Sequence, residues 1–231
     1  MASPETVEGR AAWYSLAFAL RNTSASLLDV EPTELEGGLY VTAHDGVASA
    51  RAFLSDRLEN GAGYASHLAL PAVFETMLHE FWARVQPAWR EHGGGCDASC
   101  ARCLRDYVNL PYHPILDWRL AEDMLKIIAT PDTALHLTDS PWEPLITGDD
   151  APIRRSLKEL AFEPLDPEGR LPTFVYEANH GTEAVVVRHP LWTDEHPSVL
   201  RAVAHVEHEL HARRVTVMSP FMLLRRPTEV L

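Results

Sequence analysis

Three cysteines lie within eight consecutive residues, at Cys96, Cys100 and Cys103. The last two form a Cys-x2-Cys pair, a spacing that lets two thiolates bind one metal ion from a single turn. Cys96 is close enough to join them from the preceding loop. Thiolates are typical ligands of zinc or of an iron–sulfur cluster, and zinc takes four ligands in a tetrahedron. The sequence therefore predicts a structural site for Zn2+ that needs one further ligand.

The fourth ligand is expected to be a histidine, because Cys3His is a common structural set. His113, ten residues after Cys103, is the preferred candidate. His92, four residues before Cys96, is the alternative, since the glycines between them permit it to fold back. Small buried thiols, a catalytic thiol and a catalytic zinc with bound water are the competing hypotheses. The polar neighbours of the cysteines disfavour the first, and the lack of a glutamate at a short motif distance disfavours the last.

The residues around the cluster resemble a known family. They are similar to the zinc-binding C-terminal domain of unknown function of bacterial DEAD/DEAH-box helicases of the MrfA type, and most of all to the form in the DrmB component of the DISARM anti-phage system. The segments that carry the resemblance are Trp13–Leu16, Phe53–Tyr64, Cys96–Asn109, His113 and Leu116–Ala121. Together they cover about residues 8–130. The MrfA-type domain has four cysteines, whereas here Gly94 stands where a Cys-x-Cys pair would begin.

The resemblance implies a non-catalytic, zinc-stabilised accessory domain that acts beside a superfamily-two DEAD/DEAH-box helicase in DNA processing, repair or phage defence. The chain has no Gly-x4-Gly-Lys-Ser/Thr phosphate loop, so we expect ATPase activity to belong to the partner. Two alternatives stay open. One is a metal-dependent hydrolase or nuclease-like enzyme that uses Asp56, Glu59, His113 and Asp117. The other is a zinc-stabilised protein-interaction module with no nucleic-acid role.

Three arginines, Arg102, Arg105 and Arg119, flank the cysteine cluster. Guanidinium groups suit phosphate contacts, so these residues are candidates for a local DNA-binding patch. Ion pairs with neighbouring carboxylates are an equally good explanation. The net charge of −13 argues against a nucleic-acid binder that uses its whole surface.

Two further groups of polar residues favour structural roles. Asp56 and Glu59 precede the Asn-Gly-Ala-Gly-Tyr turn at residues 60–64, and we expect capping of that turn rather than catalysis. The last predicted helix carries His205, His208 and His211, but HExxH is absent, so a solvated polar face is the preferred interpretation.

The composition is that of an ordinary globular protein, with 231 residues and 46% hydrophobic residues. An odd, clustered cysteine count differs from a secreted disulfide framework. No apolar run is long enough to span a bilayer, and the polar N-terminus does not resemble a signal peptide. We therefore expect a cytoplasmic protein with no membrane partner.

The periodicity of apolar residues predicts an α+β fold in which helices pack on short mixed strands. The predicted helices are 7–29, 71–90, 115–129, 153–161 and 198–213, and the predicted strands are 39–43, 52–54, 174–176, 184–187 and 215–217. Composition further predicts a domain at 1–130 with an embedded zinc knuckle, a linker at 131–149, and a small α/β-like segment at 150–231.

Overall fold

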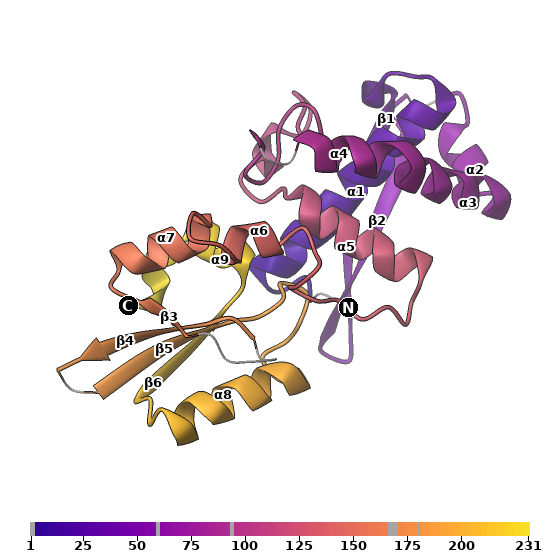
Figure 1. Ribbon diagram of the computed structural model, residues 1–231. Helices are drawn as coiled ribbons and strands as arrows, with labels where there is room; N and C mark the ends of the chain where they lie inside the picture. Colours follow the sequence, from indigo (N-terminus) through magenta and orange to yellow (C-terminus); the bar gives the residue numbers. More distant parts are fainter. Residues whose placement is uncertain (1–2, 59–60, 93–94, 166–170, 180) are drawn as a thin grey trace. The chain divides into compact units, whose positions relative to one another are not determined.

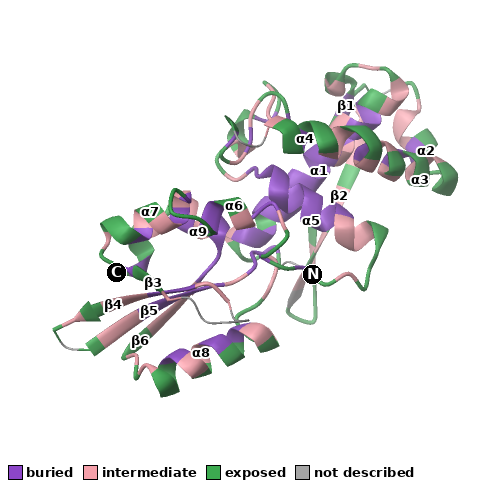
Figure 2. Cartoon of the chain, in the orientation of Figure 1, coloured by how far each residue is buried: buried purple, intermediate pink, exposed green. Residues whose placement is uncertain are grey.

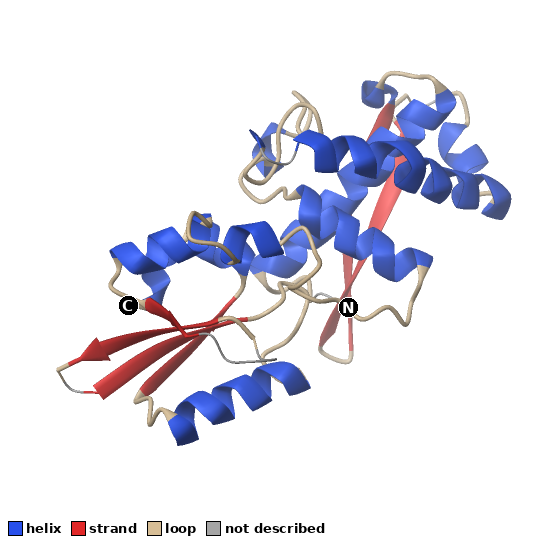
Figure 3. Ribbon diagram, viewed as in Figure 1, coloured by secondary structure: helices blue, strands red, loops and turns tan. Residues whose placement is uncertain are grey.

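The computed structural model describes residues 3–58, 61–92, 95–165, 171–179 and 181–231 (Figure 1). The chain forms two compact units, Met1–Ala134 and Leu135–Leu231. Each unit contains one β-sheet with helices around it (Figure 3), so the predicted α+β class is confirmed. Glu59, Asn60 and Gly94, which the sequence predictions mention, lie outside the described residues.

The first unit is built on a long helix and a β-hairpin. Its elements are α1 (Val7–Leu28), β1 (Leu35–His44), β2 (Val47–Asp56), α2 (Tyr64–Leu68), α3 (Pro71–Glu80), the π-helical segment η2 (Phe81–Val85), α4 (Gln86–His92) and α5 (Trp118–Ala129), with short 3-10 turns η1 (Pro32–Glu34) and η4 (Leu110–Tyr112). α1 packs against α5 and against both strands. Buried residues concentrate on α1 and α5, which form the core (Figure 2).

Local turn chemistry shapes the hairpin. Asp45 and Gly46 both have positive φ angles, 50° and 77°, as a two-residue hairpin turn requires. The register therefore runs without a break from His44 opposite Val47 to Leu35 opposite Asp56. Both strands are longer than the sequence predicts, since the predicted strands were residues 39–43 and 52–54.

The predicted helix 71–90 is one continuous helical run with a π-helical segment in its middle. Proline lacks an N–H, and its ring crowds the carbonyl four residues earlier. In this run Pro87 follows directly after η2, whose wider turn accommodates it. The run therefore continues past Pro87 to His92 and does not end at the proline.

Two aspartates accept hydrogen bonds from backbone N–H groups, one at the glycine turn and one at the start of α5. Asp56 accepts hydrogen bonds from the backbone N–H groups of Gly63 (2.7 Å) and Ala65 (2.8 Å), which is the predicted cap. Gly63 adopts a φ of 81°, so a side chain there would be strained. Asp117 is the N-cap of α5, and the helix therefore begins at Trp118 rather than at residue 115.

The second unit is a four-stranded sheet covered by helices. Its elements are α6 (Glu143–Ile146), α7 (Pro152–Glu159), β3 (Glu163–Leu165), β4 (Thr173–Ala178), β5 (Gly181–Val187), α8 (Pro197–Glu209), β6 (Arg214–Met218), α9 (Pro220–Arg225) and the 3-10 turn η5 (Pro227–Val230). The strand order is β3-β4-β5-β6; only the β5–β6 pair is parallel, and α8 is its crossover. In Figure 1, α8 lies on one face of the sheet, with α7 and α9 on the other.

Four large apolar residues within the predicted linker 131–149 are buried in the core of the second unit. Leu137, Trp142, Leu145 and Ile146 are buried, and Leu145 and Ile146 lie on α6. A segment rich in Pro, Asp and Thr therefore packs through its few large apolar side chains, which a composition average over the segment conceals.

Candidate metal centre

The three cysteines lie in the segment between α4 and α5, where a tight turn brings them together. The backbone N–H groups of Cys103, Leu104 and Arg105 all point at the carbonyl oxygen of Cys100, at 3.1, 3.2 and 3.0 Å. This turn places the sulfurs of Cys100 and Cys103 3.9 Å apart. Two sulfurs bound to one tetrahedral zinc, each about 2.3 Å from the metal, are roughly 3.8 Å apart. The Cys-x2-Cys pair thus has the spacing that zinc requires.

His92 completes a group of four ligands with the cysteines. The imidazole and the sulfurs of Cys96, Cys100 and Cys103 each offer one ligand atom, and all four atoms lie within 4.8 Å of one another. Cys96 and Cys103 are buried, and His92 and Cys100 are half-buried. A His/Cys3 set of this kind is a common donor set of structural zinc sites.

The hydrogen bonding of His92 leaves one ring nitrogen for the metal. Its Nδ1 lies 3.0 Å from the carbonyl oxygen of Ala88, one turn earlier on α4. A carbonyl only accepts, so Nδ1 carries the proton and Nε2 has the lone pair. Nε2 is buried and has no hydrogen-bond partner among the described residues. A metal-binding histidine usually has this arrangement, in which its other ring nitrogen donates to a carbonyl.

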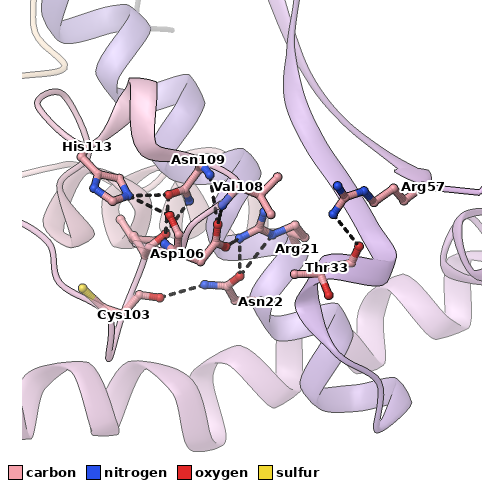
Figure 4. Close-up of polar contacts among 10 residues, drawn as sticks. Arg21, Asn22, Thr33, Arg57, Cys103, Asp106, Val108, Asn109 and His113 are labelled. Carbon is pink, nitrogen blue, oxygen red and sulfur yellow. Dashed lines mark hydrogen bonds and ion pairs between the residues drawn. The ribbon is translucent and has the colours of Figure 1, made fainter.

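His113, the preferred candidate from the sequence, is not part of this group. Its Nε2 lies 3.0 Å from the carbonyl oxygen of Asp106 and 2.8 Å from Oδ1 of Asn109 (Figure 4). Burial and the charge of Arg105 lower the pKa of His113. The structure therefore gives His113 a role in ordering the loop, and it assigns the fourth position to His92, the alternative candidate.

The cysteine sulfurs accept backbone hydrogen bonds. The N–H of Cys100 points at Sγ of Cys103 (3.1 Å), and the N–H of Arg102 points at Sγ of Cys100 (3.4 Å). Burial raises the pKa of the Cys100 thiol, but the Arg102 N–H and the side chains around it outweigh this effect, and the pKa is lowered. Burial raises the pKa of Cys96 to about 11 and also raises that of Cys103. Without a cation these two sulfurs hold protons, which zinc displaces on binding.

Two residues of helix α1 contact the cysteine turn and the loop that follows it (Figure 4). Arg21, which is almost fully buried, forms an ion pair with Asp106, and Asn22 donates from Nδ2 to the carbonyl oxygen of Cys103 (2.9 Å). The other oxygen of Asp106 accepts from the N–H groups of Val108 (2.7 Å) and Asn109 (3.0 Å). No pattern in the sequence indicates these contacts, because residues 21 and 106 are 85 positions apart.

The three arginines of the predicted DNA-binding patch have different environments. Arg102 is exposed, and Arg105 is half-buried and donates from Nε to Oγ of Ser99 (2.8 Å). Arg119 is only 4% exposed; its Nη1 donates to the carbonyl oxygen of Asp97 (2.7 Å) and its guanidinium lies over the ring of Trp118. Arg119 thus supports the loop from inside, whereas Arg102 is exposed.

The histidines of the last predicted helix form no ligand group with other described residues. His208 and His211 are exposed and His205 is half-buried, as expected for a solvated face. The helix ends at Glu209, and His211 has a positive φ of 50° in the following turn.

Comparison with known families decides what the four-residue group binds. The model of one family, described as the MrfA Zn-binding domain, matches residues 16–104. The matched segment includes His92 and all three cysteines. This region is a zinc-binding domain. No curated protein and no solved structure matches the chain.

Zinc would be held in this domain by His92, Cys96, Cys100 and Cys103, and its chemical contribution there is to cross-link the end of α4 to the turn that follows. Residues 93–95 are all glycines, so the cation would supply a cross-link that side chains at these positions cannot provide. Among the described residues, none of the helices combines the length and the apolar character needed to cross a membrane.

Proposed function

We propose that this chain is a non-catalytic, zinc-binding accessory protein that acts with a superfamily-two helicase in DNA processing or phage defence. The observation that carries the proposal is the donor set. Four protein side chains each offer one ligand atom, which is the number that a structural zinc ion would take, whereas a catalytic zinc keeps one position for water or substrate. A closed site of this type stabilises a surface and does not activate a water molecule.

The helicase partner is inferred from two likenesses. The matching family model carries the name of an MrfA domain, and the residues around the cysteines resemble the helicase-associated form of that domain. The chain has no phosphate-binding Walker loop of its own. ATP hydrolysis would therefore lie outside these 231 residues, and the zinc-binding domain would supply a contact surface.

The enzyme alternative loses support from the environment of its candidate residues. Asp56 caps backbone N–H groups, Asp117 caps α5, and His113 orders the loop after the cysteines. Glu59 lies outside the described residues. Each described candidate thus has a structural task. The interaction module without a nucleic-acid role remains the second candidate, because Arg119 is buried and the chain carries a net charge of −13.

Affinity purification of the tagged, zinc-loaded chain from its natural host tests the partner. We expect mass spectrometry to recover a superfamily-two helicase with the wild type and with His113→Gln, and to recover much less with Cys103→Ser. ATPase activity should co-purify with the helicase and be absent from the isolated chain. Recovery of other proteins but no helicase, from growing and from phage-infected cells, would overturn the proposal.

DNA binding separates the two remaining candidates. Fluorescence anisotropy with a labelled single strand and a labelled duplex, at low and moderate salt, should show salt-dependent binding by the helicase complex that Arg102→Gln weakens. If the helicase alone binds DNA as tightly as the complex does, the chain is an interaction module. Loss of the gene should raise the plating efficiency of phage if the role is in defence.

A further inference from the structure

Cys100 and Cys103 lie at the two ends of one hydrogen-bonded backbone turn. The N–H of Cys103 donates to the carbonyl oxygen of Cys100 at 3.1 Å, so residues 100–103 form a four-residue turn. The α-carbons at the two ends of such a turn lie within about 7 Å of each other. A disulfide needs α-carbons roughly 4.4–6.8 Å apart. The backbone of this turn is therefore suited to a disulfide between its ends.

The two sulfurs also lie close together. Their separation is 3.9 Å, compared with about 2.05 Å for the bond of a disulfide. The N–H of Cys100 points at Sγ of Cys103 at 3.1 Å, so the second sulfur lies over the first residue of the turn. The remaining gap of about 2 Å is small enough for rotation of the two side chains to close it.

The three cysteines differ in how far solvent reaches them. Cys96 and Cys103 are only 4% and 5% exposed, whereas Cys100 is half-buried. A small oxidant therefore meets Cys100 first, because the oxidation of cysteines follows their exposure and thiolate character. In the zinc-loaded domain this sulfur is a thiolate, which is the nucleophilic form. Cys103 is its partner within the turn, whereas Cys96 lies in the loop before it.

We propose that Cys100 and Cys103 form a reversible disulfide with hydrogen peroxide as the oxidant, and that this reaction releases the zinc ion. The Cys100 thiolate attacks one peroxide oxygen: an S–O bond forms, the O–O bond breaks and hydroxide leaves, which gives a sulfenic acid. The Cys103 thiolate then attacks the sulfur of Cys100: the S–S bond forms, the S–O bond breaks and a second hydroxide leaves. The two sulfurs together lose two electrons, which reduce the peroxide to two hydroxide ions.

The disulfide removes two of the four ligands of the metal centre. His92 and Cys96 remain, and two donors do not complete the tetrahedron that zinc takes. The new bond closes only the turn and does not connect it to α4, which carries His92. Oxidation thus breaks the link between α4 and the cysteine turn. This regulatory role rests on the proposed function, in which that link orders the surface that contacts the partner.

The test starts from the zinc-loaded full chain, reduced and then freed of excess thiol. Hydrogen peroxide is added in increasing amounts, a chromophoric chelator reports the zinc released, and a sample without peroxide is the control. We expect one zinc ion to leave for each disulfide formed, while the count of free thiols falls from three to one. Peptide mass mapping should place the disulfide between Cys100 and Cys103. Dithiothreitol followed by zinc should restore the loaded form.

The first step is tested on the same zinc-loaded chain with dimedone, a reagent that captures sulfenic acids. With less peroxide than protein, we expect the adduct on Cys100 rather than on Cys96 or Cys103. His113→Gln is the matched control variant. Its ring lies outside the ligand group, so this variant should release zinc at the same peroxide concentration as the wild type.

Four results would overturn the proposed switch: zinc retained under excess peroxide, a disulfide that involves Cys96, a dimedone adduct mainly on Cys96 or Cys103, or irreversible sulfinic acids in place of a disulfide. Each of these leaves the zinc-binding function intact, because the untreated chain still holds its metal. A purified chain that never holds zinc would overturn both, so the two failures are distinguishable.

Discussion

Arg90 on α4 donates from Nε to Oε2 of Glu122 on α5, at 3.0 Å, and the second nitrogen of the guanidinium contacts the other carboxylate oxygen. The Glu122 side chain is fully buried. This bidentate pair joins the last turn of α4, which carries His92, to the helix that follows the cysteine loop. The two helices that flank the metal centre are therefore joined by a contact that does not involve the cation.

Removal of Arg90 should be costly because it leaves a buried carboxylate without its cation. The hydrogen bond to Glu122 raises the pKa of Arg90, so its guanidinium is charged at neutral pH. We expect Arg90→Met to lower the free energy of unfolding by about 3 kcal/mol in urea titrations of the zinc-loaded protein. Arg84→Met is the control: Arg84 is 72% exposed, its pair with Glu80 lies on one helical run, and we expect a loss of about 0.5 kcal/mol. Equal effects of the two variants would contradict a structural role for the Arg90 pair.

The choice between the two histidines can be measured directly. His92→Ala removes a ligand and should weaken zinc binding at least ~100-fold, since even loss of an outer-shell partner costs 10–100-fold. His113→Ala should keep one zinc per chain and lose only stability, because its ring orders the loop through Asp106 and Asn109. Competition with a chromophoric chelator measures both affinities. The opposite ranking would return the fourth position to His113.

Zinc affinity should fall as the pH falls. Burial raises the pKa of Cys96 to about 11 and raises that of Cys103, so both thiols are protonated in the metal-free protein at neutral pH. Binding releases these protons, and each one contributes a factor of ~10 in apparent affinity per pH unit. Affinity measured between pH 6 and pH 8 should therefore rise steeply. Calorimetry in buffers of different ionisation enthalpy counts the protons released; a count of zero would contradict thiolate ligation.

The cap at the glycine turn provides a test away from the metal. Asp56→Ala removes the acceptor for two backbone N–H groups, those of Gly63 and Ala65, and should lower the free energy of unfolding by about 1–2 kcal/mol. Glu36→Ala, an exposed position on β1, should change it by less than about 0.5 kcal/mol. Zinc content should be unchanged in both variants. If Asp56→Ala abolished a hydrolytic activity at unchanged stability, the enzyme alternative would regain support.

Local features were predictable from the sequence because their causes are local. The spacing of Cys96, Cys100 and Cys103 indicated a metal site, and Asp56 was recognised as a cap. In each case the residues lie within a few positions of one another, so turn chemistry or ligand spacing suffices. Helix ends were less predictable: the helical run reaches His92 because η2 accommodates Pro87.

Only the tertiary structure decided between residues of the same type. His92 and His113 are both imidazoles near the cysteines, and the difference is that the fold brings a ring nitrogen of His92, and not one of His113, within 4.8 Å of all three sulfurs. The ion pair of Arg21 with Asp106 depends on how a distant helix packs. Sequence spacing determines which ligand types are available, whereas packing of distant segments determines which of them face a common point.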